Sequence, residues 1–159
     1  AQYGQAFRMK IIGCDTQPVD MAGVAFERVS FDRLLRESDV ISIHIHLTPE
    51  NRKLIDAAAL AKMKPSAILI NTSRGAIIDE HALVDALTQG RLAAAGVDVI
   101  EGEWRDDLDQ HPLIAYARTH GNLVITPHVG GVTFESQAMA YAAAARKLHD
   151  FLHTPQAPV

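Results

Sequence analysis

One stretch of the sequence constrains the fold more than any other: four apolar residues, 67–70, followed by Asn71-Thr72-Ser73-Arg74-Gly75. The apolar run predicts a buried strand that ends in side chains able to hydrogen-bond a ligand. Ligands of open α/β sheets bind beyond the carboxyl ends of the strands. Arg74 therefore lies where a fixed cation can meet a small anion, and its planar guanidinium can bind a carboxylate bidentately. Taken alone, the stretch is also compatible with a surface arginine that follows a strand.

Apolar runs and amphipathic segments alternate along the rest of the chain. The predicted strands cover residues 10–15, 24–26, 40–45, 67–70, 92–99 and 122–126. Residues 1–9 read as the end of a helix, and further helical segments are predicted at 31–37, 48–50, up to 60–63, 79–87, 112–118 and from 133 or 135 to about 152. A strand followed by a helix throughout predicts an α/β fold, a doubly wound parallel sheet with helices on both faces. Ser30 and Asp79 are the expected N-caps of two of these helices, and Gly90 the expected terminator of the second.

Composition narrows the class of protein. The chain has 159 residues, of which 48% are hydrophobic, so it can bury one sizeable core. A net charge of −4 without a long basic run argues against a nucleic-acid partner. No stretch approaches the roughly 20 apolar residues that span a bilayer, and no signal peptide is predicted. The single cysteine, Cys14, excludes an internal disulfide and fits a reducing cytoplasm.

Five polar groups follow successive predicted strands: Asp15, His44, Arg74, Asp98 and His128. Each has a plainer explanation when taken alone. Asp15 fits a turn, Asp98 could cap local backbone, and a histidine can be a hydrogen-bonded core or loop residue. A parallel sheet would nevertheless bring all five to one rim. A cation, a titrating imidazole and carboxylates gathered there suit proton and hydride chemistry on a small acid.

Three linked motifs resemble the D-isomer-specific 2-hydroxyacid dehydrogenases, a family that includes D-3-phosphoglycerate, D-lactate, glycerate/hydroxypyruvate and formate dehydrogenases. The motifs are Asn71-Thr72-Ser73-Arg74-Gly75, then Asp98-Val99 with Glu101-Gly102-Glu103, and Thr126-Pro127-His128-Val129-Gly130-Gly131. The resemblance covers nearly the whole chain, in the right order and spacing. It implies an NAD-dependent oxidoreductase that transfers a hydride between nicotinamide and a small D-2-hydroxy acid or 2-keto acid.

The resemblance also implies a role for each catalytic residue. Arg74 would hold the carboxylate and keto oxygen of the substrate, and His128 would be the acid/base. Glu103 would pair with His128, hold its tautomer and favour its protonated form. Glu103 fits this role better than Glu101 because it lies five residues beyond Asp98.

The implied cofactor is NAD. Asp15 would bond the ribose hydroxyls, and because a carboxylate repels a 2′-phosphate and no arginine follows directly, NAD is favoured over NADP. Asp98 would contact the carboxamide side of the nicotinamide, and Gly130 and Gly131 would let the backbone approach it. The remaining implied cofactor contacts are His44, Thr48, Thr72, Ser73, Arg74 and His128. Members of the family usually dimerise through the cofactor domain, so a homodimer is expected of the full-length protein.

The sequence departs from the family in several places. His46 and Trp104 stand where the family usually has proline. The glycine-rich turn G-x-G-x-x-G, expected just before residue 1, is not in the sequence. We therefore expect residues 1–132 to be a partial NAD-binding domain that lacks its first strand, and residues 133–159 a return helix and tail towards an absent substrate domain. Such a fragment is expected to bind NAD poorly and to be inactive alone.

Two alternatives belong to other classes. One is a nicotinamide-sensing binding module, as in the corepressor branch of the family, which keeps the same motifs. The other is a zinc site, because His44 and His46 share a face of a strand and His128 ends another. The resemblance already accounts for His44 and His128, so no metal site is predicted.

Overall fold

The computed structural model describes residues 1–17, 23 and 25–153 of the chain. These residues form two compact units, Ala1–Thr126 and Pro127–Val159. Val24, which belongs to the predicted strand 24–26, lies outside the described residues. In the second unit, α6 (Phe134–His153) confirms the predicted long helix.

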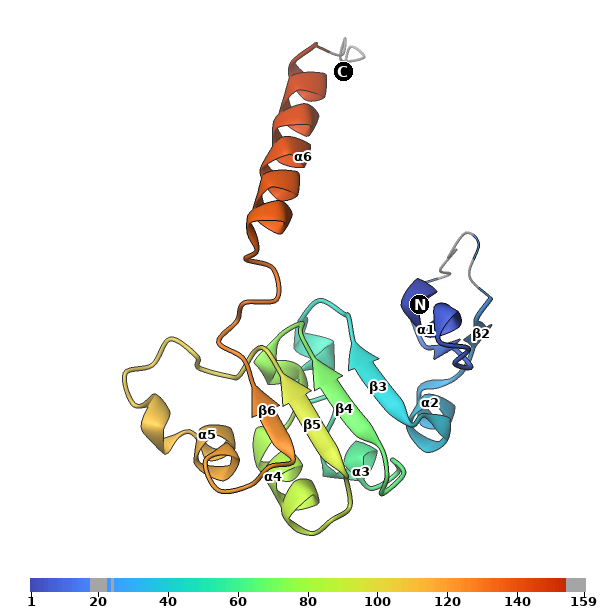
Figure 1. The fold of residues 1–159 in the computed structure, drawn as a ribbon, viewed down its shortest axis with the longest axis vertical. Coiled ribbons are helices and arrows are strands. Elements are labelled where there is room, and N and C mark those ends of the chain that lie inside the picture. Colours follow the sequence, from blue (N-terminus) through green and yellow to red (C-terminus); the bar gives the residue numbers. More distant parts are fainter. Residues whose placement is uncertain (18–22, 24, 154–159) are drawn as a thin grey trace. The chain divides into compact units, whose positions relative to one another are not determined.

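A four-stranded parallel sheet organises the first unit, with the strands in the order β3-β4-β5-β6 (Figure 1). The strands are β3 (Val40–Ile43), β4 (Ile68–Asn71), β5 (Ala94–Val97) and β6 (Leu123–Ile125). Every neighbouring pair is parallel, which confirms the predicted α/β class.

Helices cover one face of this sheet. The connecting helices are α3 (Ala57–Leu60), α4 (Glu80–Thr88) and α5 (Pro112–Ala117); α3 and α4 lie behind the strands in the view of Figure 1, and α5 lies beside β6. On the face turned towards them, strand residues such as Leu69 and Val97 join a core with Leu83 and Leu113. Because the strand order always steps in one direction, right-handed crossovers put every connecting helix on the same side.

The other face of the sheet stays apolar but exposed in the first unit. Val40 is 45% exposed, Ile68 37% and Val124 61%, each alternating along its strand with a buried residue. The connecting helices of this sheet pack on the opposite face, so these four strands leave the predicted helices on both faces a prediction. Double winding needs a reversal of the strand order, and the four described strands contain none.

A second, much smaller sheet precedes the first. The strands β1 (Ile12–Gly13) and β2 (Glu27–Arg28) pair in parallel, flanked by α1 (Gln2–Ala6) and α2 (Phe31–Glu37). No side chain of either strand is buried, and we call this pair the β1–β2 ribbon. Ion pairs hold it to α2: Arg33 pairs with Glu27 of β2, and the Lys10 Nζ, just before β1, lies 3.7 Å from Glu37 Oε2.

The predicted caps are confirmed. The Ser30 hydroxyl accepts from the Arg33 amide at 3.3 Å and the Asp79 carboxylate from the Ala82 amide at 3.3 Å. Gly90, just beyond α4, has the left-handed φ of 65° that glycine adopts readily. The described residues also contain three short 3₁₀ turns, η1 (Pro49–Asn51), η2 (Gly75–Ile77) and η3 (Leu108–Gln110). In the part of the chain that the structure describes, no helix combines the length and apolar character needed to cross a bilayer.

Candidate functional site

The carboxyl ends of the four strands lie in one row. The strand register pairs Ile43 with Asn71, Asn71 with Val97, and Val97 with Ile125. The residues that follow this row are His44, Thr72, Asp98 and Thr126. The structure therefore brings three predicted site residues, His44, Thr72 and Asp98, to one edge of the sheet.

Hydrogen bonds join neighbouring strands along this edge. The Ser73 hydroxyl donates to the Ile43 carbonyl at 2.8 Å, and the Asp98 amide donates to the Asn71 carbonyl at 2.9 Å. The Thr126 hydroxyl donates to the carboxylate of Asp98, which is only 7% exposed. These bonds fix the rim before any ligand arrives. They also commit the hydroxyl proton of Ser73, so that this side chain can offer a ligand only an acceptor.

Asn71 shapes the turn that follows β4. Its buried side chain donates from Nδ2 to the Arg74 carbonyl at 2.9 Å and accepts at Oδ1 from the Ser73 amide at 3.0 Å. The sequence analysis placed Asn71 among the side chains that could bind a ligand, and this was wrong. A fully buried amide must satisfy its polar atoms within the protein, and here it does so on the backbone.

Arg74 is exposed and lies directly before η2, in the turn that the Asn71 side chain holds. We call residues 72–75 the Arg74 turn. Its Nη1 donates to the Ser73 carbonyl at 2.6 Å. This bond orients the guanidinium while its other N–H groups can still bind an anion. The predicted cation therefore stands beside the row of strand ends.

Gly75 brings the turn after β4 against the turn after β5. A Cβ on Gly75 would lie 2.2 Å from the Ile100 carbonyl carbon and 2.3 Å from the Glu101 nitrogen. Real Cβ atoms do not approach backbone so closely, so only glycine fits here. The backbone of the Arg74 turn is therefore in direct contact with the Ile100–Glu101 peptide, two residues before Glu103.

Two buried polar side chains, Glu80 and His111, hold the backbone of Glu101. The Glu80 carboxylate accepts from the Glu101 amide at 2.7 Å and lies 3.1 Å from Nε2 of His111. Burial raises the pKa of Glu80, and the hydrogen bonds from Glu101 and His111 offset part of that rise. Neither Glu80 nor His111 was predicted from the sequence as a site residue. The only local signal was a histidine directly before Pro112, where an N-cap would stand.

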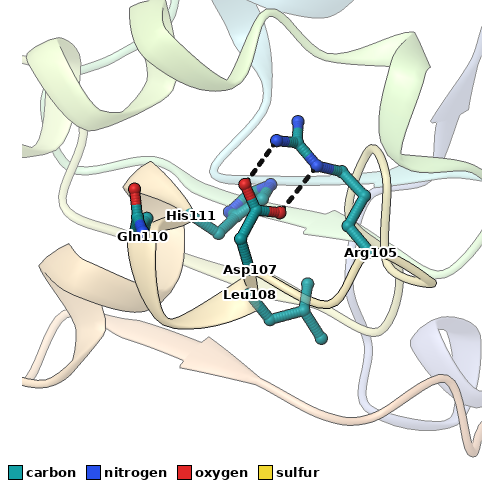
Figure 2. A pocket seen from close by; sticks show the side chains of 5 residues that line it. All are labelled: Arg105, Asp107, Leu108, Gln110 and His111. Atoms are coloured by element: carbon teal, nitrogen blue, oxygen red, sulfur yellow. Dashed lines mark hydrogen bonds and ion pairs between the residues drawn. The ribbon is translucent and has the colours of Figure 1, made fainter.

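The loop after Glu101 carries Glu103, which is half-buried. It turns through Gly102, whose φ is 74°, and encloses a pocket of about 170 Å³ lined by Arg105, Asp107, Leu108, Gln110 and His111 (Figure 2). Arg105 donates to both carboxylate oxygens of Asp107, at 2.8 and 2.6 Å, and lowers the pKa of that carboxyl. Because these charges neutralise one another, we assign no ligand to the pocket.

The other predicted residues lie in three separate places. Asp15 is exposed beyond β1, on the β1–β2 ribbon, where its Oδ1 accepts from the Gln17 amide at 2.8 Å. Thr48 is the N-cap of η1. His128, with a left-handed φ of 54°, belongs to the second unit, as do Gly130 and Gly131. A single rim that includes Asp15 and His128 therefore stays a prediction.

Among the residues that the structure describes, no group of three or more His, Cys, Asp or Glu side chains is placed to hold a metal ion.

The sequence was compared with known families and proteins. Residues 1–130 match the family model described as D-isomer specific 2-hydroxyacid dehydrogenase, NAD binding domain. The chain is 42% identical over 142 residues to D-3-phosphoglycerate dehydrogenase of Mycobacterium tuberculosis, covering 88% of this chain and 26% of that protein. It is 42% identical over 153 residues to glyoxylate reductase of Aeropyrum pernix, covering 95% of this chain and 44% of that protein.

A solved structure resembles the chain closely. The D-isomer specific 2-hydroxyacid dehydrogenase of Lactobacillus delbrueckii ssp. bulgaricus, in its NAD-complexed form, superposes with a TM-score of 0.89 at 28% identity. The match covers 99% of this chain and 50% of that one. The chain thus spans less than half the length of the two curated relatives.

Proposed function

This chain belongs to the D-isomer-specific 2-hydroxyacid dehydrogenases, in the part that corresponds to their NAD-binding domain, and we propose that it serves hydride transfer between NAD and a small D-2-hydroxy acid or 2-keto acid. One observation carries the proposal: the strand register lines up His44, Thr72 and Asp98 beside the Arg74 turn. The phosphoglycerate and glyoxylate named for the relatives indicate the substrate class.

The residues at the strand ends fit a dinucleotide. Asp15 offers an exposed carboxylate to ribose hydroxyls, and its charge disfavours a 2′-phosphate, which supports NAD over NADP. Asp98 is held by Thr126 at the nicotinamide end of the row. NAD, when bound, would supply or accept the hydride. The other proposed cofactor contacts are His44, Thr48, Thr72, Ser73, Arg74, His128, Gly130 and Gly131.

Arg74 is proposed to bind the substrate. A guanidinium can donate two parallel hydrogen bonds to a carboxylate, or one to the carboxylate and one to the neighbouring keto oxygen. The Asn71 and Ser73 contacts hold its backbone and one edge of its head group. A cation fixed in this way aligns the substrate carbon for hydride transfer without further rearrangement.

His128 and Glu103 are proposed as the acid/base pair. During oxidation of the hydroxy acid the imidazole would accept the hydroxyl proton, and during reduction it would return that proton to the keto oxygen. A carboxylate on the second ring nitrogen would fix the tautomer that this exchange requires. The proposal extends to this pair because both residues match the family motif in order and spacing.

The proposal also covers how the chain is organised. Residues 1–132 would form part of the NAD-binding domain, and residues 133–159 would lead towards a substrate domain. The outer edge of β3 has no partner strand in the described part of the sheet, which supports a further strand pairing there. On this view the chain alone binds NAD weakly and turns nothing over, and the full-length protein is a homodimer.

The test uses the full-length product of the gene that encodes this chain. NADH oxidation is followed with glyoxylate, hydroxypyruvate and pyruvate, and the chain alone is assayed in parallel. We expect turnover only for the full-length product. Arg74→Lys keeps the charge but loses the planar fork, and we expect kcat/KM to fall by about 100-fold, the scale of losing one oriented donor. The matched control is Arg36→Ala, which removes an exposed arginine on α2 that pairs with Asp32.

Three outcomes would contradict parts of the proposal. NADH binding without turnover of any 2-keto acid would point to the nicotinamide-sensing module instead. Equal activity of Arg74→Lys and the unchanged protein would remove Arg74 from substrate binding. Turnover by the 159-residue chain alone would overturn its proposed inactivity.

A further inference from the structure

We propose that Glu80 and His111 are positioning residues, which together clamp the Glu101 peptide against the Arg74 turn and so set the place of Glu103 relative to Arg74. The clamp itself is independent of the reaction. Its catalytic consequence rests on the function proposed above.

The clamp takes both backbone groups of Glu101. The Glu101 amide donates to Glu80 Oε1 at 2.7 Å, and the Glu101 carbonyl lies 3.1 Å from His111 Nε2. The same Nε2 lies 3.1 Å from Glu80 Oε2, which closes the arrangement into a ring of three residues. The amide belongs to the Ile100–Glu101 peptide and the carbonyl to the Glu101–Gly102 peptide, so neither peptide can rotate without breaking one of these contacts.

The contacts of His111 define its tautomer. His111 is the N-cap of α5, and its Nδ1 accepts a hydrogen bond from the Leu113 amide at 3.3 Å. Because an accepting nitrogen carries no proton, the ring proton is on Nε2. That proton is shared between the Glu80 carboxylate and the Glu101 carbonyl. One neutral histidine thus starts a helix with one nitrogen and holds the loop with the other.

The Ile100–Glu101 peptide packs against the Arg74 turn. The Glu101 nitrogen is close enough to Gly75 that an added Cβ would lie 2.3 Å from it. Gly75 adjoins Arg74, and Glu103 is two residues beyond Glu101. The Glu101 side chain is also held, since it pairs with Arg52. A shift of this peptide would therefore move both proposed catalytic side chains.

Burial of the pair indicates that geometry, rather than stability, is its contribution. The side chains of His111 and Glu80 are only 9% and 8% exposed. A buried carboxylate is costly to desolvate, and an apolar pair of similar volume would often fold as well. Such a pair could not fix the orientation of a peptide as two hydrogen bonds do.

Two substitutions separate the clamp from the helix cap. Glu80→Gln keeps the size but leaves one acceptor oxygen for two donors, the Glu101 amide and the Nε2–H of His111, so the closed ring cannot form. His111→Asn retains a good N-cap for α5 but is too short to reach Glu80. His111→Gln carries an N–H at about the place of Nε2 and serves as the rescue variant. The control is Asp109→Asn, which neutralises an exposed carboxylate that pairs with Arg118.

The first readout is steady-state kinetics of the full-length gene product. We expect both clamp variants to lower kcat by about 10- to 100-fold, the scale of a small misplacement of reacting groups. The KM for NADH should stay within about twofold, because none of Glu80, His111 and Glu101 is a proposed cofactor contact. The double variant should be no worse than either single one, and His111→Gln should recover part of kcat. Loss of thermal stability with unchanged kcat would overturn the positioning role.

The second readout does not depend on turnover. Nitrogen-15 NMR of the unchanged protein should report His111 as the Nε2–H tautomer and the Glu101 amide as slow to exchange with solvent. Glu80→Gln should speed that exchange, whereas Asp109→Asn should not. A proton on Nδ1 of His111, or a fast-exchanging Glu101 amide, would overturn the clamp itself. If the clamp is found in a protein that turns over no 2-keto acid, the proposed function fails and the positioning role fails with it.

Discussion

The four-stranded sheet and the β1–β2 ribbon carry different ends of the candidate site and are held together by different forces. The sheet rests on apolar side chains that are wholly buried, among them Leu69, Ile77 and Leu83. The ribbon has no buried strand residue and is tied to α2 by exposed ion pairs, of Glu27 with Arg33 and of Lys10 with Glu37. Apolar burial is insensitive to salt and pH, whereas exposed ion pairs are weak and screened.

This difference maps onto the proposed reaction. Arg74 and Asp98 stand on the sheet, where cross-strand hydrogen bonds fix the rim. Asp15, proposed to bind the ribose, stands on the ribbon. Reacting groups need positions fixed to within a fraction of an ångström, while a ribose contact tolerates more movement. The following variants test this contrast, from the largest expected effect to the smallest.

The two faces of β4 should respond very differently to truncation. Leu69→Ala opens a cavity in the fully buried core and should lower the free energy of unfolding by about 2–5 kcal/mol. Ile68→Ala, on the exposed face of the same strand, should lower it by about 1 kcal/mol, the smaller burial term. Denaturant unfolding of both variants measures the contrast. Equal losses would mean that the apolar outer face of the sheet is covered in solution.

Gly75→Ala should be the most damaging glycine substitution in the first unit. The new methyl group would overlap the Ile100–Glu101 peptide, and overpacking should lower the free energy of unfolding by about 3 kcal/mol. Gly121→Ala is the matched control, because a Cβ there meets no atom within 4 Å. Thermal unfolding of the two variants compares them directly. A Gly75→Ala protein as stable as the control would mean that the two turns are not in contact.

Asn71→Ala tests the buried amide below the rim. It leaves the Ser73 amide and the Arg74 carbonyl without partners away from water, which should lower the free energy of unfolding by about 1–3 kcal/mol. Asn51→Ala removes a similar pair of bonds, to Thr48 and His46, in an exposed turn where water replaces them. If the two variants unfold at the same denaturant concentration, burial of Asn71 does not add to its contribution.

The parts of this fold that depend on local chemistry could be predicted from the sequence. Ser30 and Asp79 cap helices as expected because a cap is decided by residues three apart. The rim of His44, Thr72 and Asp98 follows from strand order, since parallel strands end at one edge.

Other features depend on contacts between distant residues and carry no local signal. Continuous apolar runs such as 40–45 favoured a sheet covered on both faces, but only the strand order decides which faces receive helices. Glu80 and His111 look like a helix residue and a loop residue in sequence, 31 positions apart, and their pairing is known only from the fold. The buried role of Asn71 was misjudged for the same reason.

Removing Arg33, the α2 side chain that pairs with Glu27 of β2, should loosen the ribbon without unfolding the four-stranded sheet. In Arg33→Ala, the amides of Glu27 and Val29, which bond to the carbonyls of Ile11 and Gly13, should exchange faster with deuterium. The amides of the four-stranded sheet should keep their protection, because no core residue is altered. A uniform rise in exchange across both sheets would show that the two regions unfold as one unit.

Acid should act on the two regions with opposite sign. Hydrogen bonds from Arg33 hold the pKa values of Glu27 and Glu37 below the ordinary 4.5. A carboxyl whose folded pKa is lowered stabilises the fold above its unfolded pKa and loses that contribution as the pH falls through the folded value. Protection of the ribbon amides against hydrogen exchange should therefore decline below pH 4.5, and in high salt the decline should begin at a higher pH.

Glu80 behaves in the reverse way. Its raised pKa means that the folded protein binds this proton at a higher pH than the unfolded chain, so acidification from neutral pH to 4.5 favours the folded sheet at this group. Hydrogen exchange followed against pH checks both signs, and a ribbon that stays protected well below pH 4.5 would mean that ion pairs do not hold it.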